Sequence, residues 1–433
     1  MKSDNLKKLK WVNGKALIVA IDIGKIKHTG YCRCPEGNEV KPFDFFNNKR
    51  GFKELWDRIC QTKRIHNLEE EVVGFESTGP YAEPLLHYLR AKGVRLVQVN
   101  PMHTKKLKEL QDNSPGKTDH KDPKIIADII ELGHALSVII PEGASAELRR
   151  LTQARERSIQ RRTVLFNQLQ GLVFIIFPEF LQVMKGVKSK SSRYILKNYP
   201  TPEKIRERGV DGLTEMLKKV SRGRLGRERA ESLYHAAEES VGIKAGQKGI
   251  IFEIKECIFL IEVCERFIAT LEEEMSHHLR EIPYSRSILS IKGIGKIIVA
   301  GLIGEVGDFR EFHTISEIIK HAGLDLFEIS SGKRKGRKRI SKRGRPLLRK
   351  LLYFASINTV RRGGIMAGDY RRYIQRGMPR MKALIVIARK LLRIIFALVR
   401  DGSEFVRDYS RIQYQPKEVG FDQKTSLDYV LGV

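Results

Sequence analysis

Four acidic residues in the first third of the chain lie at the ends of strand-like segments or just before a helical one: Asp22, Glu76, Asp119 and Asp122. The runs Ala16–Ile21 and Glu71–Phe75 are short and rich in β-branched residues, which predicts strands ahead of the first two acids. A helical pattern over Pro123–Leu136 follows the other two. Carboxylates at strand ends point into a cleft, where three or four of them can bind two hard divalent cations. Such cations clamp the attacking and leaving oxygens of a phosphodiester, so the predicted chemistry is phosphoryl transfer on nucleic acid.

The order of elements in this region predicts an α/β fold. Three strands, a helix, a strand, a helix and a strand follow one another over residues 17–21, 30–34, 40–46, 52–65, 71–75, 81–92 and 95–99. Gly37 provides the turn between the second and third strands, which favours an antiparallel arrangement of the first three. This is the order of the ribonuclease H-like fold, with carboxylates on the matching strands. We therefore expect a catalytic domain of that class over residues 15–142.

The chain is strongly basic. Its 433 residues include 80 Lys and Arg against 51 Asp and Glu, which gives a net charge of +29 at pH 7 and a pI near 9.9. This excess predicts a nucleic-acid partner rather than a merely soluble basic protein or a membrane-surface protein. No segment approaches the ~18 apolar residues of a membrane helix, and the basic start of the chain leads into a strand rather than a signal-peptide core. Five cysteines without a disulfide or zinc pattern fit a reducing cytoplasm, so we expect a cytoplasmic, nucleoid-associated protein. A chain of 433 residues is too long for one hydrophobic core, so we expect two or three domains.

Residues 143–280 are predicted to be mostly helical. Apolar residues recur at helical spacing over Leu148–Phe180 and again over Ile251–Leu279. Two interpretations remain open: a coiled-coil or helical-hairpin insert that pairs protomers, and a plain helical packing domain. Beyond this region we expect a helical C-terminal domain over residues 285–410 and a polar tail over residues 411–433.

A glycine-rich turn lies near the start of the C-terminal domain. Gly293 and Gly295 separate two helical runs within Ser287–Phe312, a pattern typical of a helix-hairpin-helix. Backbone N–H groups at such a turn can bind a phosphate, with Lys296 beside them. A purely structural turn between two helices is the alternative.

A serine pair precedes the most basic segment of the chain. The basic residues that follow Ser330 and Ser331 are candidates for contacts with a nucleic-acid backbone: Lys333, Arg334, Lys335, Arg337, Lys338, Arg339, Lys342, Arg343 and Arg345. A hydroxyl in a small turn beside cations makes Ser331 a candidate nucleophile. An ordinary loop next to a solvated basic arm is the alternative. Helices are expected afterwards over Leu347–Asn358 and Met381–Gly402.

Several motifs together resemble one known family. In the first part of the chain they are VAIDIGK (Val19–Lys25), FESTG (residues 75–79) and KTDHKD (Lys117–Asp122). In the second part they are IKGIGKIIVAGLIGEVGDF (residues 291–309), AGLDLFEISSG (322–332), RISKRGRPLLRKLL (339–352) and IARKLLRIIFAL (387–398). With these motifs the chain resembles the DEDD-type insertion-sequence transposases of the IS110 family, which are also described as bridge-RNA-guided recombinases.

The resemblance implies a RuvC-like N-terminal domain in which four carboxylates bind Mg²⁺: Asp22, Glu76, Asp119 and Asp122. It implies a C-terminal transposase domain in which Ser331, or less favourably Ser330, attacks DNA and forms a covalent phosphoserine intermediate, with strand exchange and no hydrolysis. It also implies a structured bridge RNA that pairs with donor and target DNA. The active assembly would be a tetramer, a dimer of dimers, whose composite sites combine the acids of one subunit with the serine of another.

One position departs from the family pattern. Pro123 follows Asp122 where the family usually has a small residue other than proline. Because proline suits the first turn of a helix, Asp122 could be a helix N-cap instead of a metal ligand. Lys117 and Thr118 could contact phosphate or simply shape the turn.

Three hypotheses about function follow. The first is an RNA-guided DNA recombinase that uses metals and a serine. The second is a RuvC-like junction nuclease that hydrolyses DNA with two metals and no covalent intermediate. The third is a non-catalytic nucleic-acid-binding protein built on an inactive nuclease fold. A protein–DNA adduct that depends on Ser331 would distinguish the first from the others.

Overall fold

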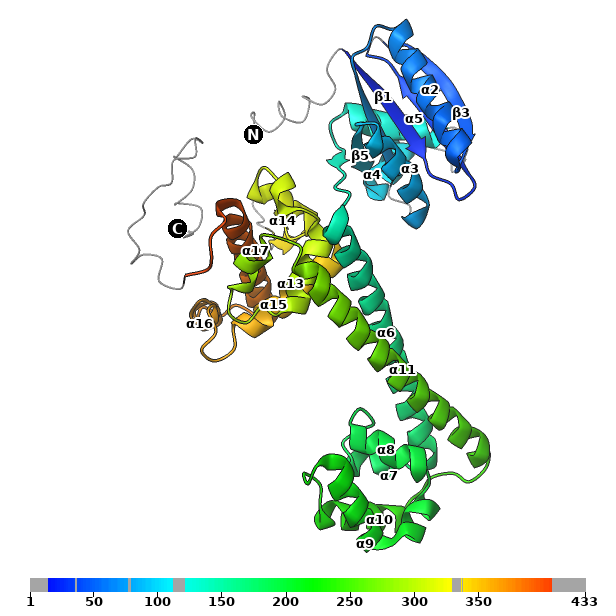
Figure 1. Cartoon of the computed structure of the whole chain (residues 1–433), viewed down its shortest axis with the longest axis vertical. Coiled ribbons are helices and arrows are strands. Elements are labelled where there is room, and N and C mark those ends of the chain that lie inside the picture. Colours follow the sequence, from blue (N-terminus) through cyan, green and yellow to red (C-terminus); the bar gives the residue numbers. More distant parts are fainter. Residues whose placement is uncertain are drawn as a thin grey trace. The chain divides into compact units, whose positions relative to one another are not determined.

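The computed structural model describes residues 15–35, 37–76, 79–111, 121–328, 336 and 338–406 (Figure 1). The chain divides into two compact units, Met1–Ile140 and Pro141–Val433, which are described separately. The first unit is the predicted α/β region. The second unit contains both the helical middle and the predicted C-terminal domain, and the boundary expected near residue 280 stays a prediction.

The first unit is built on a six-stranded sheet with the order β3-β2-β1-β4-β5-β6. Its strands are β1 (Ala16–Asp22), β2 (Lys27–Arg33), β3 (Glu39–Phe46), β4 (Glu70–Glu76), β5 (Arg95–Val99) and β6 (Leu136–Ser137). The first three strands are antiparallel, β1, β4 and β5 are parallel to one another, and β6 returns antiparallel to β5. This arrangement agrees with the predicted ribonuclease H-like order of elements.

Helices cover both faces of this sheet (Figure 1). Helices α2 (Lys49–Ile65) and α3 (Glu83–Ala91) pack on the face that receives the odd-numbered residues of β1, such as Leu17 and Val19. Helix α5 (Lys121–Glu131) packs on the opposite face, against the even-numbered Ile18 and Ala20. Because side chains alternate along a strand, a residue's parity decides which helices it meets.

Gly74 of β4 shows how closely α5 lies on the sheet. A β-carbon at this position would come within 2.2 Å of Ile130 Cδ1 and 3.0 Å of Val97 Cγ2. The glycine therefore lets the helix sit directly on the strand that ends in Glu76.

Two elements of the first unit differ from the prediction. Helix α4 (Pro101–Gln111) was not predicted, and its sequence has little apolar periodicity. The helix predicted over Pro123–Leu136 instead begins at Lys121 and ends at Glu131. Gly133 then takes a φ of 70°, a conformation that ends a helix readily. A turn and two irregular residues follow, and the short strand β6 begins at Leu136.

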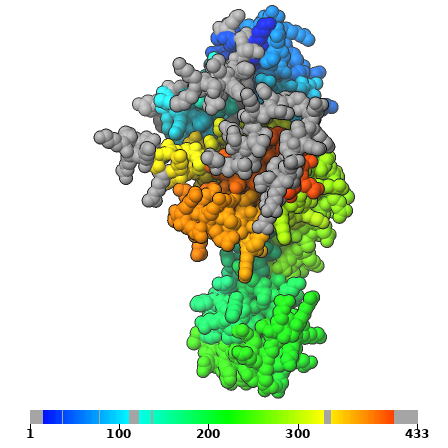
Figure 2. Space-filling view, turned by 90° about the vertical axis from the view of Figure 1, so that its left-hand side faces the viewer, coloured from blue at the N-terminus to red at the C-terminus, as the bar shows by residue number. Residues whose placement is uncertain are grey.

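Two long antiparallel helices, α6 (Gly143–Ile176) and α11 (Gln247–Leu279), form a helical hairpin in the second unit, which is one of the arrangements left open for this region. Near one end Arg155 Nη2 lies 2.6 Å from Glu272 Oε1, and near the other the Ile243 amide donates a 3.1 Å hydrogen bond to the Ile175 carbonyl. Between them the chain forms α7 (Pro178–Val183), α8 (Lys190–Asn198), α9 (Pro202–Ser221) and α10 (Arg227–Glu238). These four helices form the rounded green mass in Figure 2. The pairing of protomers through the hairpin stays a prediction.

The C-terminal part of the second unit packs around α13 (Lys296–Val306). Its other helices are α12 (Ser285–Leu289), α14 (Ile315–His321), α15 (Pro346–Thr359), α16 (Ala367–Gln375) and α17 (Arg380–Asp401). A two-stranded hairpin of β7 (Leu326–Phe327) and β8 (Arg339–Ile340) follows α14. Almost all of α13 is buried, and at Gly304 a β-carbon would lie 2.7 Å from the backbone of α6. In the described part of the chain no helix is long and apolar enough to cross a membrane.

Candidate active site and nucleic-acid-binding residues

Asp22 and Glu76 lie at the same edge of the sheet. Strands β1 and β4 pair in parallel with Ile21 opposite Phe75, and each strand ends at the next residue. Neighbouring strands are about 4.8 Å apart, so the two acids occupy adjacent carboxyl ends. The prediction that both carboxylates close their strands is confirmed.

The two acids also lie on the same face of the sheet. Asp22 shares its parity with Ala20, whose side chain packs among the residues of α5. Glu76 shares its parity with Val72 of the same cluster, and Thr104 of α4 donates a 3.0 Å hydrogen bond to Glu76 Oε2. Both carboxylates are therefore directed to the side of the sheet that α4 and α5 cover.

Asp122 joins this group through α4. It lies in the first turn of α5, where its charge interacts favourably with the helix dipole, and Lys108 Nζ is 2.5 Å from Asp122 Oδ1. Thr104 and Lys108 are four residues apart and so share one face of α4. That face connects Glu76 with Asp122. Since α5 begins at Lys121, Asp122 lies inside the first turn rather than at the cap position of the observed helix.

The fourth acid, Asp119, lies outside the described residues, as do Lys117 and Thr118. Among the residues that are described, no group of three or more His, Cys, Asp or Glu side chains is arranged to hold a metal ion. Asp22 and Glu76 lie at adjacent strand ends on one face of the sheet, and Asp122 is paired with Lys108 of the neighbouring helix α4. Oxygen donors of this type suit Mg²⁺. Sequence reasoning missed Thr104 and Lys108, and the only signal for them was their i, i+4 spacing in an unrecognised helix.

Ser330 and Ser331 also lie outside the described residues, together with Lys333, Arg334, Lys335 and Arg337. The segments on either side are held together by backbone hydrogen bonds. The Ser341 amide donates to the Asp325 carbonyl at 2.7 Å, and the Lys342 amide donates to the Gly323 carbonyl at 3.0 Å. Gly323 has a φ of 65°, and its backbone lies so close to Gly344 that neither position has room for a β-carbon.

The described basic residues after the serines fall into two groups. Those with exposed side chains, which form no ion pair with any described residue, are Lys338, Arg339, Lys342 and Arg343. Arg345 differs, because its Nη1 lies 3.7 Å from Glu305 Oε2 and its Nε lies 3.1 Å from His321 Nε2. Burial lowers the pKa of Arg345 and, together with the Arg345 charge, lowers the pKa of His321 to about 4. The charge of Arg345 is therefore paired with Glu305 within the fold, unlike the charges of its exposed neighbours.

The glycine turn lies between α12 and α13, as expected. Gly293 has a φ of 102° and approaches the Asn358 carbonyl, so a side chain there would be strained. Gly295 is the N-cap of α13 and provides no side-chain cap, and Lys296 is the exposed first residue of that helix. A role in binding phosphate stays a prediction.

Comparison with known proteins decides the family. A transposase model of the DEDD type found in IS110 matches residues 19–178, and a model for the transposases of the IS116/IS110/IS902 family matches residues 285–389. The chain belongs to the IS110 transposase family. The first match contains all four predicted acids, and the second contains the glycine turn and the serine pair. The resemblance seen in the motifs is confirmed.

Relatives of this transposase match it over most of its length. The insertion element IS110 43.6 kDa protein of Streptomyces coelicolor is 21% identical, over 89% of this chain and 95% of the relative. The IS116 44.8 kDa protein of Streptomyces clavuligerus is 26% identical with the same coverage. The transposase for insertion sequence element IS1111A of Coxiella burnetii is 24% identical, over 79% of this chain and 84% of the relative. Membership in this family implies the cutting and rejoining of DNA.

Proposed function

We propose that this transposase cuts and rejoins DNA with a divalent-metal cluster and a serine nucleophile. The cluster would consist of Asp22, Glu76, Asp119 and Asp122, and the nucleophile would be Ser331. The observation that carries the proposal is the position of Asp22 and Glu76 at adjacent strand ends, facing the helices that bring in Asp122.

The metal is Mg²⁺ in this proposal, held by the carboxylates of the cluster. When bound, it would supply Lewis-acid stabilisation of the charge on a reacting phosphate. The chain's own residues orient the ligands. Thr104 fixes one oxygen of Glu76, and Lys108 keeps the Asp122 carboxylate beside α4. A cation at this edge would compete with Lys108 for Asp122.

The serine step conserves the energy of the phosphodiester. The Ser331 oxygen would form a bond to phosphorus while a P–O bond of the DNA breaks, and the serine proton would end on the leaving DNA oxygen. A hydroxyl of the other DNA strand would then attack the phosphoserine, release Ser331 and restore a phosphodiester. A neutral hydroxyl is a weak nucleophile, so the step needs the electrostatic help of nearby cations or metals.

RNA guidance and the tetramer belong to the same proposal. The net charge of +29 supports binding of DNA and of a structured bridge RNA. The exposed cations Lys338, Arg339 and Lys342 support backbone contacts that carry no sequence information. Sequence choice would then be made by base pairing with the RNA. In a dimer of dimers, Asp22 of one subunit would act with Ser331 of another.

The test is trapping of a covalent protein–DNA adduct with the transposase purified together with its RNA and element ends. Ser331→Ala should abolish the adduct and DNA cleavage while DNA binding persists, whereas Ser330→Ala, its neighbour and control, should retain both. Asp22→Asn and Glu76→Gln should lose cleavage without losing DNA binding. Full cleavage by Ser331→Ala would establish hydrolysis without a covalent intermediate instead.

Mixed assemblies test the composite site. Asp22→Asn and Ser331→Ala proteins are each expected to be inactive alone. When they are mixed, some sites would combine an intact acid cluster with an intact serine from different subunits, and part of the activity should return. Absence of any recovery in assemblies that contain both variants would contradict the shared site.

A further inference from the structure

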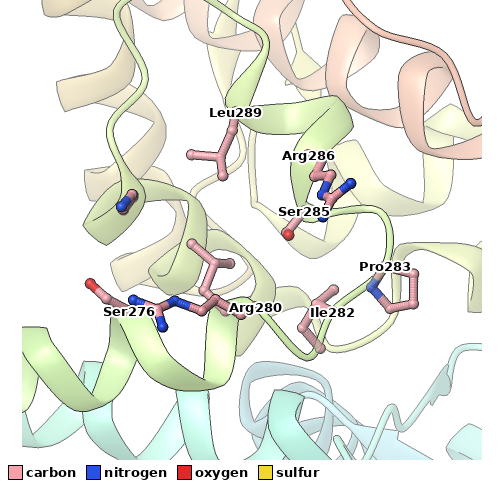
Figure 3. A pocket seen from close by; sticks show the side chains of 9 residues that line it. Ser276, Arg280, Ile282, Pro283, Ser285, Arg286 and Leu289 are labelled. Atoms are coloured by element: carbon pink, nitrogen blue, oxygen red, sulfur yellow. The ribbon is translucent and has the colours of Figure 1, made fainter.

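The second unit contains a pocket of about 420 Å³ that the proposed chemistry does not use (Figure 3). It lies between the end of α11, the short helix α12 and the start of α13. The residues that give it its chemical character are Ser276, Arg280, Ser285, Arg286, Leu289 and Lys296. The pocket therefore combines cations and hydroxyls with a partly apolar wall.

The charge of the pocket is uncompensated. Arg280, Arg286 and Lys296 are exposed, and none of them forms an ion pair with any residue that the structure describes. Among the described residues no acidic side chain lines the pocket. The nearest acid in sequence, Glu281, accepts instead from His278 at 2.8 Å. Three cations around one hollow, with no acidic partner in the described part of the chain, favour an anionic ligand.

The hydroxyl of Ser285 adds a neutral hydrogen-bond donor to the cations of the pocket. Ser285 as a residue is only 4% exposed, no side-chain hydrogen bond joins it to a described residue, and it lines the pocket. Its hydroxyl points into the pocket in Figure 3. A serine hydroxyl that opens on the pocket can donate one hydrogen bond to an acceptor bound there. Ser276 is different, because its hydroxyl already donates to the Glu272 carbonyl at 2.8 Å.

The start of α13 adds a third contribution. Lys296 is the first residue of this helix and lines the pocket, and the N-cap Gly295 supplies no side chain to its first N–H groups. The amino end of an 11-residue helix carries partial positive charge and free N–H donors. A tetrahedral phosphate, with several acceptor oxygens, matches donors that come from α11, α12 and α13 together.

We propose that this pocket binds a backbone phosphate of DNA outside the catalytic cluster. The inference rests on the proposed function only in that DNA is taken as the substrate. Arg280 and Arg286 would hold the phosphate by charge-assisted hydrogen bonds, Ser285 would donate one hydrogen bond, and Leu289 would contact the sugar. Such a contact fixes the position of the duplex without reading its sequence.

The test measures binding of a duplex DNA of random sequence in EDTA, at several salt concentrations. Arg280→Gln/Arg286→Gln should weaken binding about tenfold and lower the slope of log Kd against log salt by about 1, since one phosphate contact is lost. The matched control is Lys255→Gln/Arg266→Gln, which removes from helix α11 two exposed charges that form no ion pair with a described residue. If the control shows the same loss, only net charge matters and the proposal is wrong.

The Ser285→Ala variant distinguishes a specific hydrogen bond in the pocket from a general effect of net charge on DNA binding. It should weaken DNA binding severalfold and leave the salt slope unchanged, because no charge is removed. Arg280→Lys/Arg286→Lys should retain most of the slope. A pocket double variant that binds DNA like the wild type would overturn the proposal, provided that circular dichroism shows both proteins folded.

Two further arms identify the source of the phosphate. Inorganic phosphate at constant ionic strength should raise the thermal midpoint of the wild type only slightly, and DNA should raise it much more. A single-stranded RNA arm should show a smaller effect of the double variant than duplex DNA does, and a defect confined to RNA would overturn the assignment. Because binding in EDTA needs neither metal nor serine, this result is independent of the Asp22→Asn and Ser331→Ala outcomes.

Discussion

Thr104 donates a 3.0 Å hydrogen bond to Glu76 Oε2. Helix α4, which was not predicted from the sequence, therefore positions the Glu76 carboxylate at the end of β4. One turn further along the same helix, Lys108 pairs with Asp122 at 2.5 Å. One face of α4 therefore organises two acids that are far apart in sequence. The arrangement gives α4 a positioning role for the proposed metal cluster.

Thr104→Val should slow DNA cleavage by about tenfold without weakening DNA binding. Thr104 is 3% exposed, and valine has nearly the same shape but no hydroxyl, so Glu76 loses a directional partner. Thr104→Ser keeps the hydroxyl and should retain most of the activity. The measurement is the single-turnover rate of adduct formation. Equal rates for the valine and serine variants would show that the hydrogen bond is not used.

Lys108→Met should lower the Mg²⁺ concentration that gives half-maximal cleavage. A cation bound by Asp122 no longer has to displace the Lys108 ammonium. The side chains are 35% and 15% exposed, so solvent screens the pair and we expect roughly a fivefold shift, ~1 kcal/mol. Lys105→Met removes an exposed lysine of the same helix and should not change the titration. A higher half-maximal concentration in Lys108→Met would contradict competition for Asp122.

Gly74→Ala should destabilise the first unit by about 1–3 kcal/mol, because the added methyl group overlaps Ile130 Cδ1 in a filled core. Adding Ile130→Val removes that atom and should recover part of the loss. Gly171→Ala, on an α6 surface with nothing within 4 Å, should be neutral or stabilising. Urea unfolding measures all three. A fully stable Gly74→Ala protein would mean that α5 can move away from the sheet.

The stability of the second unit should fall as the pH drops from about 6.5 to about 4. Burial, helped by the Arg345 charge, lowers the pKa of His321 to about 4, while in the unfolded chain it lies near 6.5. Within this window the unfolded state binds more protons, so acid favours unfolding, and below pH 4 this group contributes no further loss. The expected size is at most ~3 kcal/mol.

His321→Gln should flatten this pH dependence in urea unfolding at pH 7 and pH 4.5. The exposed His313→Gln variant is the control and should leave it unchanged. If His321→Gln loses stability with acid as steeply as the wild type, another group is responsible.

Local pattern was enough to predict the sheet of the first unit. Runs such as Ala16–Ile21 are buried because β-branched residues fill both faces of a covered strand, and their ends were predicted to within a few residues. Helix α4 could not be predicted in the same way. It is held by Thr104 and Lys108, whose partners are distant in sequence, and it has only a small apolar side.

The basic segment shows the same limit. The sequence predicts that Arg345 contacts nucleic acid as its exposed neighbours do. In the structure, Arg345 contacts Glu305 and His321, which lie on other helices. A cation's role depends on whether an acid from elsewhere in the chain reaches it, and local sequence carries no such information. Strand β6 was missed for a related reason, because two residues become a strand only when β5 lies beside them.

The helices α7–α10 leave and rejoin the α6/α11 pair at neighbouring points. Ile175 and Ile243 share a backbone hydrogen bond, and a β-carbon on Gly242 would collide with the Ile176 carbonyl. Because the chain leaves α6 and returns towards α11 at adjacent points, a helical segment of another size fits between them without any change in the length or spacing of these two helices. The segment between α6 and α11 can therefore change in length without changing the spacing of these two helices.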